Sequence, residues 1–199
     1  MRWPMRKLLI GLNLLILSMV PIQAQAGAPL DTIKSRVNQM LVVLRDPALQ
    51  GESAKELKTK KLRLIFDSTF DYIELSRSTL SRNWDKFKPD QQQEFVKLYK
   101  ALLQKVYLDI ILSYKDQEVV FGRERELGPN KFEVESKIVS GSTDTPVHFR
   151  MTLKNGEWWI YDVVIENISI VANYRSQFSR ILTKESPEAM LEALRKKVS

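Results

Sequence analysis

The strongest candidate for chemistry in this sequence is a single carboxylate. Asp162 stands between Tyr161 and Val163 in a run that is otherwise apolar. Burial in such a setting raises a carboxyl pKa toward the range of a general base. The alternative is a structural carboxylate that accepts hydrogen bonds from backbone amides or pairs with an arginine such as Arg175. Sequence patterns leave both interpretations open.

The other ionisable residues point away from catalysis. His148 occupies a polar position in an alternating segment and has no serine or cysteine partner, so we expect a solvated surface histidine. Two acid pairs, Asp85 with Asp90 and Glu124 with Glu126, are placed in loops or at helix starts, where capping and solubility explain them. We therefore expect no catalytic residue and no enzyme.

Scarce residue types exclude whole classes of site. The 199 residues contain no cysteine, one histidine and seven scattered glycines. Disulfides and thiolate metal sites are excluded, and no cluster of imidazole ligands is available. No glycine-rich loop is present to hold a nucleotide phosphate. We expect neither a cofactor nor a metal ion.

The first 26 residues have the order of a secretory signal peptide. Arg2, Arg6 and Lys7 precede a 13-residue apolar run at 8–20, and a small-residue cleavage pattern follows at 24–26. The run is shorter than the roughly 20 residues of a membrane span. We expect Sec-dependent export and removal of residues 1–26.

Cleavage also changes how the charge is interpreted. Removing residues 1–26 leaves 173 of the 199 residues and takes away three positive charges, so the net charge falls from +7 to +4. A moderately basic exported protein rarely meets nucleic acid and often meets anionic lipid surfaces. Nucleic acid is therefore not an expected partner.

The elements that must position these residues fall into two kinds. Helical spacing predicts helices near 30–45, 53–66, 71–80, 89–111, 170–181 and 186–194, with Ser53, Asp71 and Ser186 as caps. Alternation predicts strands near 132–138, 147–153 and 158–165. Helices, then a meander of strands, then helices indicate one α+β domain over 27–199.

The helix at 89–111 carries two apolar stripes side by side, and Leu102 and Val106 belong to one of them. A face this wide should contact two neighbours, such as another helix and a sheet or cavity. The chain is also rich in aromatic residues. Periodicity alone does not separate a filled core from a hollow one.

A hairpin at Asn155-Gly156 sets the register of the last two strands. It places Met151 opposite Ile160 and Phe149 opposite Asp162, which gives an apolar face that contains a carboxylate. Tyr161 and Val163 then lie on the opposite face. A bulge near Asp162 would reverse that assignment.

Four segments resemble the MlaC or toluene-tolerance family of periplasmic phospholipid-binding proteins. They are WWIYDVVIENISIV at 158–171, NYRSQF at 173–178, LSRNW at 80–84 and KPDQQQEF at 88–95. The similarity runs from about residue 33 to the C-terminus. The family usually has glycine where Ser81 and Asn167 stand here, and asparagine tolerates left-handed backbone.

The resemblance implies helices packed on a curved antiparallel sheet, in the manner of nuclear-transport-factor-like and cystatin-like folds, around a hydrophobic cavity. It implies a monomeric carrier that shuttles phospholipid between an outer-membrane Mla lipoprotein complex and an inner-membrane Mla ABC transporter, which maintains outer-membrane lipid asymmetry. The acyl chains are then expected on apolar residues of the sheet and helices: Leu102, Val106, Val134, Ile138, Phe149, Met151, Ile160, Tyr161, Val163, Tyr174 and Phe178.

Two other functions remain open at this point. One is an enzyme of the same cone-shaped fold that acts on a hydrophobic substrate through Asp162 and Tyr161. The other is a periplasmic adaptor with a filled core.

Overall fold

A computed structural model of the chain describes residues 28–114 and 116–199. The predicted signal peptide at 1–26 lies outside these residues. The described elements are α1 (Pro29–Arg45), η1 (Pro47–Leu49), η2 (Glu52–Ala54), α2 (Lys55–Asp67), α3 (Tyr72–Leu80), η3 (Ser81–Lys86), α4 (Pro89–Leu112), β1 (Glu118–Gly128), β2 (Lys131–Ser140), β3 (Thr143–Lys154), β4 (Glu157–Ile165), β5 (Ile168–Ser169), α5 (Ile170–Lys184) and α6 (Pro187–Val198).

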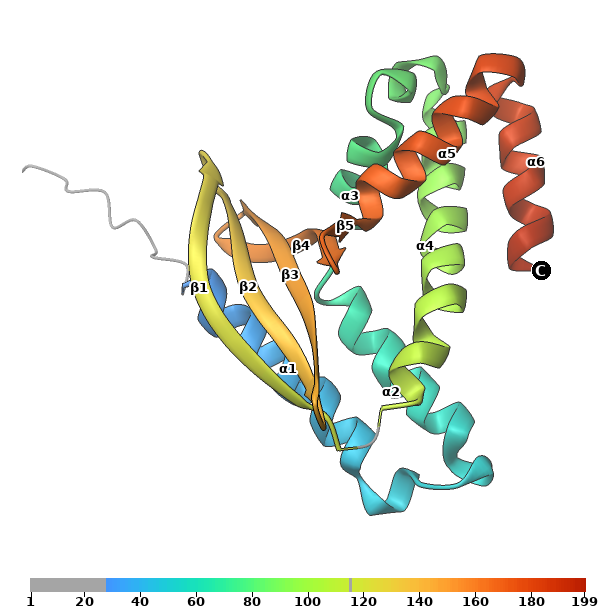
Figure 1. Cartoon of the computed structure of the whole chain (residues 1–199). Helices are drawn as coiled ribbons and strands as arrows, with labels where there is room; N and C mark the ends of the chain where they lie inside the picture. The colour runs from blue at the N-terminus through green and yellow to red at the C-terminus, as the bar shows by residue number, and fades with distance from the viewer. Residues whose placement is uncertain (1–27, 115) are drawn as a thin grey trace, which may run out of the picture.

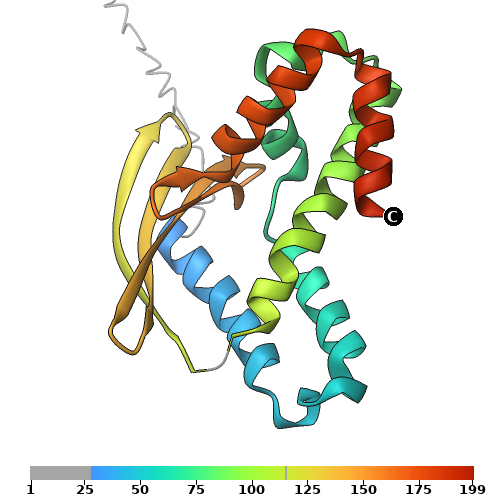
Figure 2. The same ribbon diagram turned by 45° about the vertical axis from the view of Figure 1, so that its right-hand side comes forward.

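The five strands form one antiparallel sheet in the order β1-β2-β3-β4-β5. The sheet is curved, and α1 packs against its inner face at β1 and β2 (Figure 1). Helices α3 to α6 form a second body beside the sheet, while α2 and the end of α4 lie below (Figure 2). The prediction of an α+β fold built of helices on a curved antiparallel sheet is confirmed.

Three hydrophobic clusters hold these parts together. The helical cluster joins α3, η3, α4, α5 and α6 and centres on Phe95 and Tyr99, whose side chains are completely buried. The sheet cluster joins α1 to the inner face of the sheet through Ile33 and Val134. The third cluster joins α1, α2 and α4 around Leu62. Phe70 packs against all three clusters, so the clusters meet around this side chain.

Two of the three predicted helix caps are confirmed. Asp71 accepts hydrogen bonds from the amides of Ile73 and Glu74, and Ser186 accepts one from Ala189. The capping box predicted at Ser53 is wrong, because this serine lies in the short helix η2 and α2 begins after Ala54 without a side-chain cap.

Strand β1 was not predicted as an element, and the placement of Glu124 and Glu126 in loops is wrong. Both lie in β1, where irregular pairing with β2 hides the alternation. Glu124 opposes Val134 in the sheet, and its carboxylate accepts a hydrogen bond of 2.5 Å from the Leu30 amide at the start of α1. Glu124 therefore joins the first helix to the edge of the sheet.

The predicted hairpin register is right near the turn and wrong beyond it. Asn155 and Gly156 both have positive φ, as a type I′ turn requires, and Met151 pairs with Ile160. A bulge then shifts the register, so Phe149 pairs with Val163 instead of Asp162. The extra residue reverses the faces of the rest of β4.

Candidate functional site

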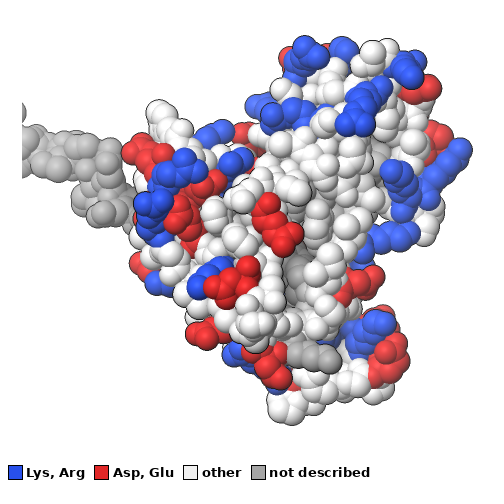
Figure 3. Space-filling view, viewed as in Figure 1, with Lys and Arg blue, Asp and Glu red and all other residues white. Residues whose placement is uncertain are grey.

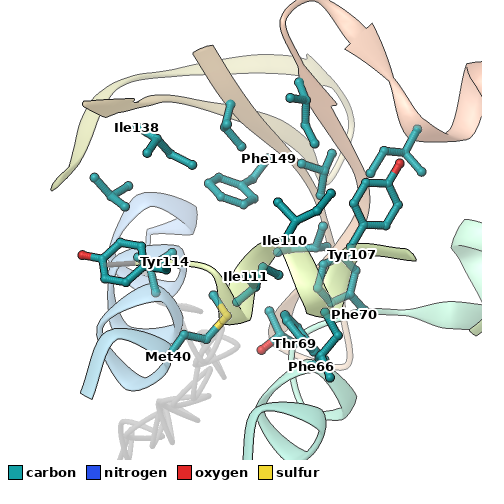
Figure 4. Close-up of a pocket in the computed structure, with 18 of the residues that line it drawn as sticks. Met40, Phe66, Thr69, Phe70, Tyr107, Ile110, Ile111, Tyr114, Ile138 and Phe149 are labelled. Atoms are coloured by element: carbon teal, nitrogen blue, oxygen red, sulfur yellow. The ribbon is translucent and has the colours of Figure 1, made fainter. Parts of the chain in front are cut away.

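An apolar cavity of about 500 Å³ lies where the three hydrophobic clusters meet. Its walls come from α1, α2, α4 and the inner face of the sheet (Figure 4). Aliphatic and aromatic side chains make up most of its lining: Val37, Met40, Leu41, Leu44, Phe66, Phe70, Tyr72, Leu75, Leu103, Tyr107, Leu108, Ile110, Ile111, Tyr114, Val119, Ile138, Val147, Phe149, Ile160, Val163, Ile165 and Ile170. No Asp, Glu, Lys or Arg occurs among the described residues that line it.

The cavity opens to solvent beside α4. The space-filling view shows a hollow between the sheet and this helix, bordered mostly by uncharged side chains (Figure 3). Ile110 lines the cavity and is still 62% exposed. An exposed isoleucine at the entrance to an apolar cavity is a contact surface for an apolar ligand that enters or leaves.

Tyr72 and Tyr107, two tyrosines of the cavity, add no charge at neutral pH. Burial raises the pKa of the Tyr107 and Tyr72 phenols above their ordinary value. Both remain neutral well above pH 7. The cavity therefore presents an uncharged wall, which suits hydrocarbon and offers no acid or base for catalysis.

Four of the predicted contact residues line the cavity. Ile138 projects from β2, Phe149 from β3, and Ile160 and Val163 from β4. Val163 reaches the inner face because the bulge in β4 moves it there.

The other seven predicted residues lie elsewhere. Val134 and Met151 are buried in the sheet cluster, next to the cavity lining. Leu102, Tyr174 and Phe178 belong to the helical cluster. Val106 is 41% exposed on α4.

Tyr161 is the remaining one, and it has no partner in β3 because it is the extra residue of the bulge. The ammonium of Lys131 lies 4.9 Å from the centroid of its ring. Tyr161 is absent from the cavity lining.

Sequence reasoning missed much of the helical wall. Met40 and Leu41 of α1, Phe66 of α2, and Tyr107 and Ile111 of α4 all face the cavity. A signal was present for α4, because Tyr107 and Ile111 belong to its second apolar stripe. No sequence pattern indicated that α1 and α2 turn toward the same space.

Asp162 is buried, 2% exposed, and lies outside the cavity lining. Its carboxylate accepts hydrogen bonds from the Ser169 hydroxyl at 2.6 Å, the Val171 amide at 3.0 Å and Arg150 Nη1 at 3.1 Å. The structural interpretation is therefore right, although the pairing arginine is Arg150. Arg175 donates instead to the Ser78 carbonyl. Asp162 fastens the start of α5 to the sheet.

A second buried carboxylate extends this ionic network over the outer face of the sheet. Glu133 accepts from Arg150 Nε at 2.8 Å and also pairs with Arg125. Burial raises the pKa of Glu133, but the two guanidinium donors outweigh burial and the pKa is lowered. His148 is half-buried, with Nδ1 3.8 Å from Glu133, so the expectation of a solvated histidine is wrong.

Metal and membrane sites receive no support from the described part of the chain. In residues 28–114 and 116–199, no three His, Asp or Glu side chains gather closely enough to hold a metal ion. Within the same ranges no helix has both the length and the apolar character that a membrane crossing requires.

Comparisons with known proteins agree with the fold. The family model described as MlaC protein matches residues 34–196. The intermembrane phospholipid transport system binding protein MlaC of Haemophilus influenzae is 24% identical over 115 residues, which are 55% of this chain and 54% of that protein. The chain thus spans about half the length of this relative.

Two further proteins match over more of the chain. The toluene tolerance protein ttg2D of Pseudomonas putida is 24% identical over 171 residues, covering 85% of this chain and 80% of that protein. The phospholipid-binding protein of Ralstonia solanacearum, solved in complex with a phospholipid, superposes with a TM-score of 0.75 at 20% identity. That match covers 84% of this chain and 95% of the solved one, and it shows a shared fold.

Proposed function

This chain belongs to the MlaC family, and on that basis we propose that it is a phospholipid-binding carrier that holds acyl chains in the cavity between α1, α2, α4 and the sheet. The observation that supports the proposal best is the cavity itself. It is large, uncharged and open at one side, and its lining is mostly hydrocarbon. These are the properties of a site for an apolar ligand.

The physical need for such a carrier is large. Each methylene transferred from water to an apolar site contributes about 0.8 kcal/mol, so two acyl chains with about 30 methylenes face a cost above roughly 20 kcal/mol in water. A protein cavity removes most of this cost without breaking a bond. Transfer between membranes then needs binding and release only.

The place of action follows from the N-terminal segment. We propose that residues 1–26 are a Sec signal peptide and that the mature domain, residues 27–199, works in the periplasm as a monomer. There it receives phospholipid from, or delivers it to, an outer-membrane Mla lipoprotein complex and an inner-membrane Mla ABC transporter, and so maintains outer-membrane lipid asymmetry. N-terminal sequencing of protein recovered from the periplasm should begin at Gly27. A first residue inside the apolar run at 8–20 would contradict the proposed cleavage.

The two alternatives receive no support from the geometry. Asp162 uses its carboxylate oxygens on Ser169, Val171 and Arg150, and it does not face the cavity. Tyr161 is likewise absent from the lining. The hollow between the clusters argues against an adaptor with a filled core. Binding without catalysis is what remains.

A direct test compares two tryptophan substitutions on neighbouring residues of β2. Ile138 lines the cavity, whereas Val139 follows it in the strand, is also half-buried, and is absent from the lining. Ile138→Trp places an indole in the space proposed for acyl chains, and Val139→Trp is the matched control.

Native mass spectrometry of protein purified from the periplasm should show a two-chain phospholipid adduct on the wild type and on Val139→Trp. Ile138→Trp should lose most of the adduct and most of the transfer of fluorescent phospholipid between vesicles. A wild-type protein with no adduct and no transfer would refute the carrier. Equal loss of adduct and transfer in both variants would contradict the proposal that acyl chains occupy the cavity.

A further inference from the structure

Polar side chains are concentrated at one end of the cavity. The sheet pairing brings the start of β1, the end of β2 and the start of β3 together, with Glu118 opposite Val139 and Ser140 opposite Thr143. Five polar residues of the lining lie there or in the adjoining connection from α4: Ser113, Tyr114, Gln117, Ser140 and Thr145. Figure 4 shows the Tyr114 ring at the edge of the site with its hydroxyl turned away from Phe149.

Two hydroxyl groups in the remainder of the lining are engaged within the protein. The Thr69 hydroxyl donates to the Ile65 carbonyl at 2.6 Å, and the Ser136 hydroxyl donates to the carbonyl of Val147. At the polar end the Ser113 hydroxyl likewise donates to the Ile110 carbonyl, at 2.6 Å. Hydroxyl groups therefore do not distinguish this end from the rest of the cavity, whereas a nearby cation does.

A cation is held at this polar end. Arg45, the last residue of α1, lies with its guanidinium carbon 5.6 Å from the centroid of the Tyr114 ring. Its Nη2 donates to the Tyr114 hydroxyl at 2.6 Å and to the Gln117 carbonyl at 3.3 Å. The Tyr114 hydroxyl in turn donates to the same carbonyl.

Arg45 keeps donor capacity that the residues described by the structure do not use. Among the described residues no carboxylate lies within 4.0 Å of its guanidinium. By contrast, Lys137 of β2 is already paired with Asp144 at 2.6 Å. A guanidinium has five N–H donors, and the contacts above involve Nη2 alone. Arg45 is also exposed, so an anion can approach it.

We propose that Arg45, positioned by Tyr114, binds the phosphate of the lipid headgroup while the acyl chains occupy the cavity. This inference rests on the proposed carrier function and adds the headgroup contact to it. A two-chain phospholipid carries its phosphate directly beside the chains, so chains in the cavity place the phosphate at the polar end. A planar guanidinium matches two phosphate oxygens, and such charge-assisted contacts are among the stronger hydrogen bonds.

The proposed contact predicts that the protein prefers a lipid with a phosphate to a lipid without one. Because the contact is with the phosphate, the protein should accept different headgroup substituents and discriminate against a neutral lipid with the same chains. Dioleoyl phosphatidylglycerol should bind about tenfold more tightly than dioleoylglycerol.

The experiment measures both affinities, on lipid-stripped protein, for the wild type and three variants. Arg45→Ala removes the cation. Arg45→Gln removes the charge and keeps an amide that can still donate to Gln117. Arg63→Ala is the control, because Arg63 is an exposed arginine of α2 that, unlike Arg45, does not donate to Tyr114.

Both Arg45 variants should lose the preference for phosphatidylglycerol and bind dioleoylglycerol as the wild type does. Arg63→Ala should keep the preference. Retention of the preference in Arg45→Gln would overturn the inference. Equal weakening of both lipids in the two Arg45 variants would also overturn it, since that result indicates that Arg45 only holds the connection between α4 and β1.

Further outcomes distinguish free phosphate from the phosphate of a lipid, and failure of this inference from failure of the carrier proposal. If millimolar inorganic phosphate raises the melting temperature of the lipid-free protein through Arg45 while the lipid preference does not depend on Arg45, the site is one for free phosphate and the headgroup assignment fails. If the wild type binds both lipids equally, the inference fails and the carrier stands. If it binds neither lipid, both fail.

Discussion

Asp162→Asn is expected to destabilise this protein without abolishing lipid binding. The carboxylate accepts three hydrogen bonds, from Ser169, Val171 and Arg150, and it is 2% exposed. An asparagine oxygen can still accept from the Val171 amide, but the amide nitrogen then replaces the oxygen that accepts from both Ser169 and Arg150, so these two hydrogen bonds are lost. Arg150 keeps Glu133 as a partner at 2.8 Å, so no unpaired buried cation remains.

The magnitude follows from these contacts. A hydrogen bond to a charged group contributes about 1.5–3 kcal/mol, and two such bonds are lost, so the free energy of unfolding should fall by about 3–5 kcal/mol. For a domain of this size the melting temperature should drop by about 6–20 °C. Urea denaturation followed by tryptophan fluorescence at pH 7 measures the first quantity, and calorimetry measures the second.

Asp144→Asn is the matched control for this prediction. Asp144 pairs with Lys137 at 2.6 Å, but its side chain is 49% exposed, so the same chemical change should cost less than about 1 kcal/mol. Equal stability losses in the two variants would refute the argument that burial makes the contribution of Asp162 to stability large. Loss of lipid transfer by folded Asp162→Asn would refute its purely structural role.

Three more changes test other parts of the structure. Ser81 has φ 51° and ψ −127°, a region that favours glycine, so Ser81→Gly should raise the unfolding free energy by about 1 kcal/mol, whereas Ser176→Gly inside α5 should lower it. Because the pKa of Glu133 is lowered, its stabilisation is present above the ordinary value of about 4.5 and is lost as pH falls below it; Glu133→Gln should lower stability at pH 7 and flatten the acid limb of the stability profile. Phe95→Ala should cost about 3–5 kcal/mol in denaturation experiments, and Phe149→Ala less, because Phe149 already faces open space; equal costs would contradict the cavity.

Local patterns in the sequence determined the elements and their order. Helical spacing, the caps at Asp71 and Ser186, and the Asn155-Gly156 turn act over a few residues, and the structure confirms each of them. Family membership was also readable from four short segments, and the family model matches residues 34–196. Strand β1 was not predicted, because its irregular pairing with β2 disrupts the alternation that is typical of a strand.

Only the tertiary structure decided which apolar residues surround empty space. Leu102 of α4 and Phe178 of α5 fill the helical cluster, whereas Tyr107 of α4 faces the cavity. In the sequence all three occupy apolar positions of a helical pattern. One extra residue in β4 carried Val163 to the cavity and Asp162 to the ionic network. Periodicity shows which side of an element is apolar. The distance between two apolar faces depends instead on how the hydrophobic clusters pack against one another, and in this protein that packing leaves a cavity.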